Sequence, residues 1–297
     1  MRIGVAFPTV EIGHDLGAVR SFVQAAEDLG YDHIRILDHV LGADPQYHPE
    51  VDYFAYTHES VTHEPFTLMA YLAAFTQRVD LMTGIIILPQ RQTALVAKQA
   101  AEVDVLSGGR LKLGIGIGWN PVEYEALGED FHVRGRKSEE QIEVLRALWT
   151  QEVVSYKGQW HTITHAGINP LPVQRPIPIW IGTGRSIQPV APDRALRRIG
   201  RLADGWFNRL SPGTGAAQLA ARIHTYTQEA GRDPARLEMG GSLTLQATDP
   251  EPWIMEAKEW KEIGASHLTL GFRNGPASVD YYIDSLKQFK DRYPEKA

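Results

Sequence analysis

The sequence of 297 residues contains no cysteine. Disulfides, thiolate nucleophiles, iron–sulfur clusters and cysteine-ligated zinc all require that side chain, so each of them is excluded. Oxygen and nitrogen atoms are the ligands and nucleophiles that remain.

Positive charge is also scarce. The chain has 30 lysines and arginines against 36 aspartates and glutamates, which gives a formal net charge of -6. A nucleic-acid-binding protein or a polybasic membrane anchor needs a basic patch or excess. We therefore expect a small-molecule substrate, and neither a nucleic-acid partner nor a membrane partner.

Long apolar runs are missing as well. No stretch reaches the ~18 apolar residues of a membrane-spanning helix, and the apolar run within residues 1–8 is too short for a secretory signal. We expect a soluble cytoplasmic protein. With 43% hydrophobic residues and no linker or low-complexity segment, the chain predicts one domain over residues 1–297.

Hydrophobic periodicity alternates between strand and helix patterns along the whole chain. The expected strands cover residues 3–7, 33–37, 79–88, 111–117, 178–181, 205–208, 243–246 and 267–270. The expected helices cover residues 19–29, 65–75, 94–106, 138–149, 193–202, 216–230, 254–263 and 279–289. A capping box at Ser138 and Gln141 predicts the start of the fourth helix, and a hairpin is expected over residues 153–163.

Eight strand–helix units of this kind predict an α/β fold of the (β/α)8 TIM barrel type. A doubly wound open sheet is the alternative, because alternation does not show whether a sheet closes. In a barrel the chemistry lies at the carboxyl ends of the strands. The two longest loops that follow strands, residues 38–64 and 118–137, are therefore the places to search for a site.

Asp38 and His39 directly follow the second strand. A carboxylate beside an imidazole at a strand end is suited to proton transfer. A loop histidine beside a helix-capping aspartate explains the pair equally well.

Two glycine-rich segments follow later strands. Gly114, Gly116 and Gly118 have the wrong spacing for a dinucleotide fingerprint and instead favour a strand end that admits either a flat ligand or close backbone packing. The segment 182–185, Gly-Thr-Gly-Arg, offers N–H groups and a guanidinium to a phosphate, although an ordinary βα turn explains it too.

Hydrolase and metal motifs are absent. The sequence has no Gly-x-Ser-x-Gly elbow, and the spacing of His58, Glu59 and His63 does not fit His-Glu-x-x-His. We predict no metal.

Several blocks in the same order resemble one known family. These blocks are residues 2–5, 30–32 with 37–39, 64–66, 83–85, 99–119, 123–128, 176–182 and 202–206. Together they resemble the luciferase-like monooxygenase superfamily, especially its coenzyme F420-dependent oxidoreductase branch, over nearly the whole chain.

The resemblance implies a luciferase-like barrel whose mouth holds an isoalloxazine or deazaisoalloxazine ring. The ring would rest on a bulge after the third strand, near Gly84, Ile85 and Ile86, where relatives often have a non-proline cis peptide. The cofactor tail would lie near Gly182, Thr183, Gly184 and Arg185.

Aspartate and histidine after the second strand are typical of the deazaflavin-using members. By resemblance, His39 would donate or accept a proton, and Asp38 would orient that imidazole or bind the cofactor. Trp119 stands where sugar-phosphate dehydrogenase relatives have a glutamate, which argues against a sugar-phosphate substrate.

Four further residues are expected around the substrate, and one at the cofactor. Tyr56, Arg91, Trp119 and Glu123 are the substrate candidates, and Asn120 is the cofactor candidate. Tyr56 and Arg91 are the weaker candidates, because surface positions explain them as well.

The first functional hypothesis is F420-dependent hydride transfer to or from a small organic substrate. The second is a monooxygenase that uses reduced FMN on the same barrel. The third is a barrel that binds a flavin without catalysis, since a fold does not prove an activity. Relatives in this family commonly form homodimers, but this sequence has no interface signature.

Overall fold

The computed structural model describes residues 1–51, 54–184, 187–245, 250–272, 275–276 and 278–293. Within these residues, eight parallel strands form a barrel. They are β1 (Arg2–Ala6), β2 (His33–Ile36), β3 (Asp80–Thr83), β5 (Leu111–Gly116), β8 (Ile179–Gly182), β9 (Gly205–Phe207), β10 (Glu238–Thr244) and β11 (His267–Gly271). The sheet closes because β1 pairs with β11 and β3 pairs with β5. The (β/α)8 barrel is confirmed, and the open-sheet alternative is wrong.

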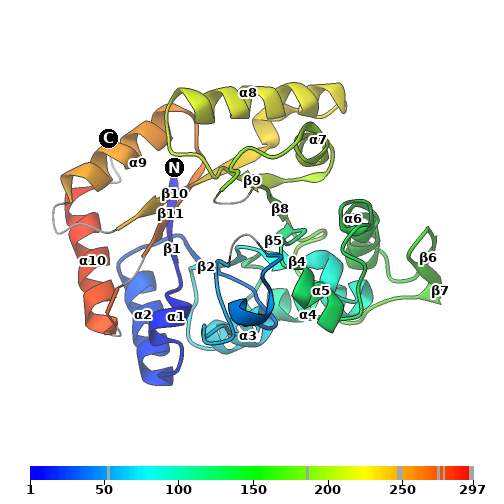
Figure 1. The fold of residues 1–297 in the computed structure, drawn as a ribbon, viewed down its shortest axis with the longest axis horizontal. Helices are drawn as coiled ribbons and strands as arrows, with labels where there is room; N and C mark the ends of the chain where they lie inside the picture. The colour runs from blue at the N-terminus through cyan, green and yellow to red at the C-terminus, as the bar shows by residue number, and fades with distance from the viewer. Residues whose placement is uncertain (52–53, 185–186, 246–249, 273–274, 277, 294–297) are drawn as a thin grey trace.

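Helices surround the strands (Figure 1). The long ones are α2 (Leu16–Asp28), α3 (Pro65–Ala73), α4 (Thr93–Leu106), α6 (Arg134–Thr150), α7 (Asp193–Leu202), α8 (Thr214–Glu229), α9 (Glu251–Glu262) and α10 (Val279–Arg292). Helix α2 illustrates why they form: Asp15 caps its first turn, and Val19, Phe22 and Val23 bury one face against the barrel. None of the described helices combines the length and apolar character that a bilayer crossing requires.

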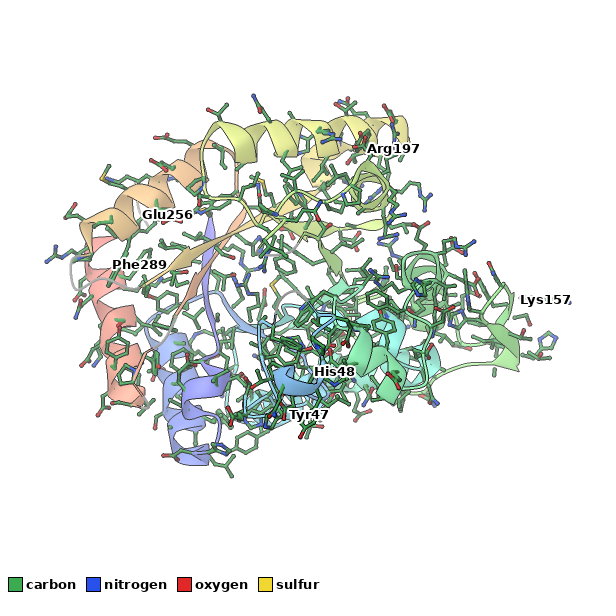
Figure 2. The ribbon with its side chains drawn as sticks, viewed as in Figure 1. Tyr47, His48, Lys157, Arg197, Glu256 and Phe289 are labelled. Atoms are coloured by element: carbon green, nitrogen blue, oxygen red, sulfur yellow. The ribbon has the colours of Figure 1, made fainter. Side chains whose placement is uncertain are left out.

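Short elements occupy the connections. They are α1 (Thr9–Ile12), α5 (Pro121–Ala126), and the 3-10 turns η1 (Pro45–Tyr47), η2 (Leu88–Gln90) and η3 (Pro234–Arg236). The expected hairpin is present as antiparallel strands β6 (Val154–Lys157) and β7 (Thr162–Ala166), and it ends three residues later than predicted. It projects from the barrel, with Lys157 at the periphery (Figure 2).

Three predicted elements differ most from the structure in their boundaries. The expected strand 79–88 is interrupted after Thr83 and resumes as β4 (Ile86–Ile87). Helix α6 begins at Arg134, so Ser138 is inside it and donates to the Gly135 carbonyl instead of forming a capping box. Strand β10 begins at Glu238, five residues before the expected start.

The early start of β10 has a steric reason that periodicity does not show. A Cβ on Gly240 would lie 3.1 Å from the Trp180 ring, and one on Gly241 would lie 2.5 Å from the Trp260 ring. The indoles occupy the space that larger strand residues would fill, so this part of the strand has no apolar pattern.

Candidate active site

The predicted site residues follow neighbouring strands at one end of the barrel, which we call the mouth. Asp38 and His39 follow β2, Gly84 and Ile85 follow β3, and Asn120 follows β5. Because the carboxyl ends of parallel strands share one rim, these segments converge there.

His39 belongs to a compact cluster at the mouth. Its ring stacks on Tyr56 with centroids 3.3 Å apart, and its Nδ1 lies 3.8 Å from Glu123 Oε2. The Tyr56 hydroxyl donates to Glu123 Oε2 over 2.5 Å and accepts from Asn120 Nδ2 over 3.2 Å. The structure therefore joins His39 with three other predicted residues, and we call these four the His39 cluster.

Glu123 is the charged centre of the cluster and has no exposed surface. It lies on α5, whose first turn is capped by Asn120, and it also accepts from the backbone N–H of Val40 over 2.9 Å. Burial alone would raise the pKa of Glu123, but the His39 imidazole and the Tyr56 hydroxyl outweigh it, so the pKa is below its ordinary value. The carboxylate is thus held ionised beside His39.

Burial and the bond to Glu123 act in the opposite direction on Tyr56. Both raise the pKa of its phenol, so the hydroxyl stays protonated and acts as a donor to the carboxylate. The shifts of Glu123 and Tyr56 therefore favour the same state, in which an ionised carboxylate and a neutral phenol lie beside the His39 imidazole.

Asp38 has different partners from those of His39. Its Oδ2 accepts from the Ile87 backbone N–H over 3.1 Å, and its Oδ1 accepts from Arg91 over 2.8 Å. Burial raises the pKa of Asp38, against the opposing charge of Arg91. No hydrogen bond joins the Asp38 and His39 side chains in the part of the chain that the structure describes. Asp38 therefore ties the end of β2 to β4.

Arg91, a predicted substrate residue, is already paired. It bridges Asp38 and Glu64, whose Oε1 accepts over 3.1 Å, and its guanidinium lies 5.8 Å from the Phe66 ring centroid. These contacts fit a residue that fixes the rim of the mouth.

The break after β3 has the predicted form. The peptide bond between Gly84 and Ile85 is cis. A Cβ on Gly116 would lie 2.6 Å from Ile85 Cδ1, and one on Gly182 would lie 2.8 Å from Ile85 Cγ2. The absence of Cβ atoms at these two strand ends thus lets the Ile85 side chain pack between them, and we call Ile85 and these strand ends the bed around Ile85. Ile86 is fully buried in the core, so its backbone is what it can offer to a cofactor.

The glycine-rich turn after β8 is partly described. Gly184 has a φ of 79°, and a Cβ there would lie 2.2 Å from the Pro189 carbonyl oxygen. Thr183 is half-buried beside it, whereas Arg185 lies outside the described residues. The turn requires glycine at position 184, which agrees with either a phosphate loop or a plain βα turn.

Trp119 forms an aromatic wall next to the cluster. Its ring meets Tyr56 edge-on at 5.5 Å and Phe54 at 6.2 Å. The structure therefore places Trp119, a predicted substrate residue, against Tyr56.

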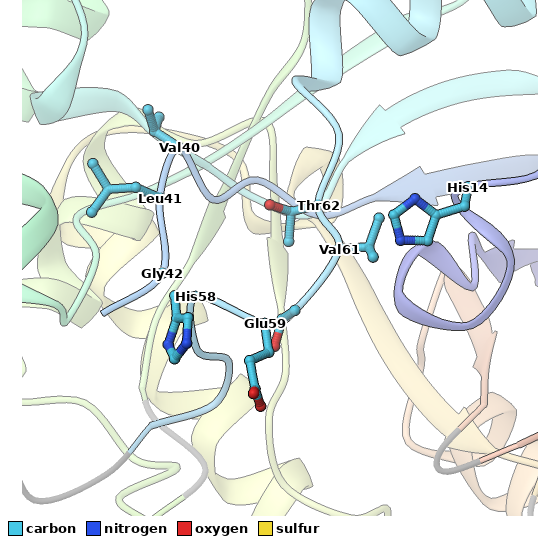
Figure 3. Close-up of a pocket in the computed structure, with 9 residues that line it drawn as sticks. His14, Val40, Leu41, Gly42, His58, Glu59, Val61 and Thr62 are labelled. Atoms are coloured by element: carbon cyan, nitrogen blue, oxygen red, sulfur yellow. The ribbon is translucent and has the colours of Figure 1, made fainter. Parts of the chain in front are cut away.

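Two surface cavities border the site without being lined by Ile85, Gly116 or Gly182. One, of about 510 Å³, is lined by His14, residues 40–42 and residues 58–62 (Figure 3). The other, of about 390 Å³, includes Arg91 and the buried Gln90 in its lining. We assign the site from the contacts above, because they join the strand ends where barrel chemistry occurs.

Sequence reasoning missed one charged residue of the mouth. Arg35 lies on β2, and its side chain crosses Gly84, where a Cβ would lie 2.3 Å from Arg35 Cδ. Its Nη1 donates to Ser242 Oγ on β10 over 3.2 Å. Alternation could have revealed it: Ile34 and Ile36 are buried core residues, so the residue between them points into the barrel.

Residues 1–262 match the sequence family described as luciferase-like monooxygenase. The chain belongs to this family. The resemblance found in its sequence blocks is therefore confirmed, and the chain has the (β/α)8 fold expected from that resemblance.

Curated relatives match part of the chain. An uncharacterized protein of Mycobacterium tuberculosis is 38% identical over 169 residues, which are 57% of this chain and 56% of the relative. An FMNH2-dependent dimethylsulfone monooxygenase of Pseudomonas putida is 29% identical over 192 residues, which are 64% of this chain and 50% of that enzyme. The chain therefore spans about half the length of these two relatives.

A solved structure extends the likeness in fold to the whole chain. An F420-dependent secondary alcohol dehydrogenase, in complex with an F420-acetone adduct, superposes with a TM-score of 0.76 at 18% identity and covers 99% of both chains. Proteins similar to this one thus include both an F420-dependent enzyme and an FMNH2-dependent enzyme.

Proposed function

We propose that this protein is an F420-dependent oxidoreductase that transfers a hydride to or from a small organic substrate. The observation that carries the proposal is the position of His39, whose Nδ1 faces a buried, ionised Glu123. An imidazole beside a carboxylate can hold a proton and release it near neutral pH, as hydride chemistry at a carbonyl or alcohol requires.

His39 would hold and move the proton at Nε2, because Nδ1 faces Glu123 Oε2. Glu123 would stabilise the protonated ring, and Tyr56 would keep that ring in place by stacking. Glu123 itself has no exposed surface, so it would act on a substrate through His39 and Tyr56.

The bed around Ile85 would receive the ring of the cofactor. Gly116 and Gly182 make room for the Ile85 side chain that would support the ring, and Asp38 fixes β4 through the Ile87 N–H. When bound, the deazaflavin supplies the hydride donor or acceptor carbon. Asn120, Thr183 and Gly184 are proposed as further cofactor contacts, and Trp119 and Arg91 as the wall and rim on the substrate side.

The alternative is a monooxygenase that uses reduced FMN in the same mouth. The Pseudomonas relative, which is FMNH2-dependent and 29% identical over the matched residues, favours it. The bed around Ile85 would hold the isoalloxazine ring of FMN in the same way. The two proposed functions therefore share a binding place and differ only in cofactor and co-substrate.

Titration of the full chain with F420 and with FMN, each followed by ring fluorescence, tests the proposal. We expect saturable F420 binding that Gly116→Ala weakens, because the added Cβ would lie 2.6 Å from Ile85 Cδ1. Micromolar FMN binding without F420 binding would reject the F420 version. Oxygen consumption in the presence of a separate flavin reductase would then support the monooxygenase.

A further inference from the structure

Arg35 is a cation inside the barrel mouth that the function proposed above does not use. It lies on β2 between two buried isoleucines and is itself only partly buried. Its guanidinium lies 5.6 Å from the Phe207 ring centroid. The charge therefore sits on the floor of the mouth and close to an aromatic face.

The charge of Arg35 has no acidic partner among the described residues. The hydrogen bond that its side chain makes there goes to the neutral Ser242 hydroxyl. A guanidinium carries five N–H donors, so most of its donor capacity is left over. A second positive charge also acts on it: burial and Arg209 together lower the pKa of Arg35 to about 10.

Other cations inside the barrel are balanced. At the amino end, Lys112 and Arg2 both contact Asp80, at 3.5 Å and 2.9 Å. A partly buried cation that only filled space would be expected to have a carboxylate of this kind, because removing a charge from water is costly. Arg35 has none, although it lies where a ligand would enter.

We propose that Arg35 binds an anionic group, a carboxylate or a sulfonate, of the substrate. The floor then has two parts: the apolar bed around Ile85 for the ring, and the cationic part formed by Arg35 with Ser242 for the anion. A planar guanidinium binds a carboxylate through two parallel hydrogen bonds. The inference names the substrate class of the mouth and in that respect rests on the proposed function.

Calorimetric titration of the full chain with benzoate and with benzamide tests the inference. The two probes share size and shape and differ in charge, and Phe207 can contact either ring. We expect benzoate to bind at least ~10-fold more tightly than benzamide, as charge-assisted bonds are about twice as strong as neutral ones. Equal binding of the two probes, or no saturable benzoate binding, overturns the proposal.

Variants locate the effect. Arg35→Gln is expected to lower benzoate affinity at least ~10-fold with benzamide unchanged, and Arg35→Lys is expected to keep part of the preference. Arg20→Gln, an exposed position on α2, makes the same change in net charge and is expected to have no effect. Benzoate binding that Arg35→Gln leaves within twofold of the parent overturns the proposal.

The anion could instead belong to a reduced cofactor ring. If Arg35→Gln weakens binding of the reduced cofactor and leaves benzoate binding intact, the substrate assignment is wrong. Anion binding is measured without cofactor, so it is independent of the proposed function. A chain that binds neither F420 nor FMN but keeps an Arg35-dependent benzoate preference rejects the function and retains the anion site.

Discussion

Each end of the barrel contains a histidine close to charged groups. His39 is partly exposed and lies beside a carboxylate, whereas His267 is buried and lies between the Lys112 ammonium and the Glu238 carboxylate, which is 3.9 Å from its Nδ1. At the carboxyl end, His39 faces the Glu123 carboxylate at 3.8 Å. At the amino end, His267 Nε2 accepts from the Lys112 ammonium over 3.1 Å. An imidazole that accepts from an ammonium must be neutral at that nitrogen.

A hydrogen-bond network occupies the amino end of the barrel. His33 Nε2 lies 2.8 Å from Thr269 Oγ1, and His267 Nδ1 lies 3.0 Å from Ser266 Oγ. Burial and the neighbouring cations hold the pKa of His33 well below its usual range and lower that of His267 to about 3. The polar and charged groups at the amino end hydrogen-bond to one another inside the barrel. Those at the mouth surround the His39 cluster, which we propose exchanges a proton. Residue type alone does not separate the two roles, whereas burial and the neighbouring cations at the amino end do.

The largest expected effect separates the two ends by activity. His39→Gln removes the proton-exchanging ring and is expected to lower kcat by ~100- to 10,000-fold, as loss of a general acid or base does. His267→Gln is expected to leave kcat within a few-fold, because its ring is enclosed at the other end. Steady-state rates with F420 and an accepted substrate measure both. Equal losses in the two variants would remove His39 from proton transfer.

Stability should show a second contrast, between two carboxylates. Asp38→Asn weakens a buried ion pair with Arg91 and is expected to cost ~3 kcal/mol, because the guanidinium loses its buried counter-charge. Asp80→Asn weakens the contacts of Asp80 with Arg2, which is 42% exposed and keeps Asp32 at 3.5 Å, and with Lys112, which keeps its hydrogen bond to His267. It is expected to cost ~1–2 kcal/mol. Denaturant unfolding measures both free energies. A larger loss at position 80 would show that the rim contacts are dispensable for folding.

The sequence predicts the barrel because alternation of apolar residues survives in most strands and helices. The prediction of the strand start is wrong at β10, where glycines face the Trp180 and Trp260 rings and the residues show no alternation of apolar and polar side chains. The prediction of the helix start is also wrong at α6, where the first turn, from Arg134, has few apolar residues. Packing between distant elements sets these boundaries, so local periodicity does not contain them.

The candidate site shows the same division. Sequence position placed Asp38, His39 and the break near Gly84 at strand ends, and the structure has them there. It did not reveal that Glu123, 84 residues beyond His39 in the sequence, is the residue that faces the imidazole. It also predicted Arg91 as a substrate contact, although Asp38 and Glu64 already pair with it. Side-chain pairing across loops follows from loop conformation, which has no short-range signature.

Replacing glycine by alanine is expected to affect cofactor binding at the mouth and stability in the interior of the barrel. Gly116→Ala puts a Cβ 2.6 Å from Ile85 Cδ1 and is expected to cost ~1–3 kcal/mol of cofactor binding. Ile85→Val removes that methyl group, so the double variant should regain much of the affinity. Gly240→Ala meets the Trp180 ring in the interior and should lower stability instead. Fluorescence titration and thermal unfolding separate the two effects; a double variant no better than Gly116→Ala would argue against contact with Ile85.

The smallest effect, measured over the single unit between pH 6 and 5, is expected at the amino end. His267 is neutral in the folded protein but binds a proton in the unfolded chain below pH ~6.5, so the unfolded state takes up more protons as pH falls. Stability that is fully present above this pH should be lost toward pH 3, by up to ~1.4 kcal/mol per pH unit for one histidine. His267→Gln should flatten the dependence between pH 6 and 5 relative to the parent, whereas His132→Gln, at an exposed position, should leave it unchanged. Denaturant unfolding across this range measures the slopes. If His267→Gln kept the parent slope, the amino-end network would not exclude the proton, and the contrast between the two ends would fail.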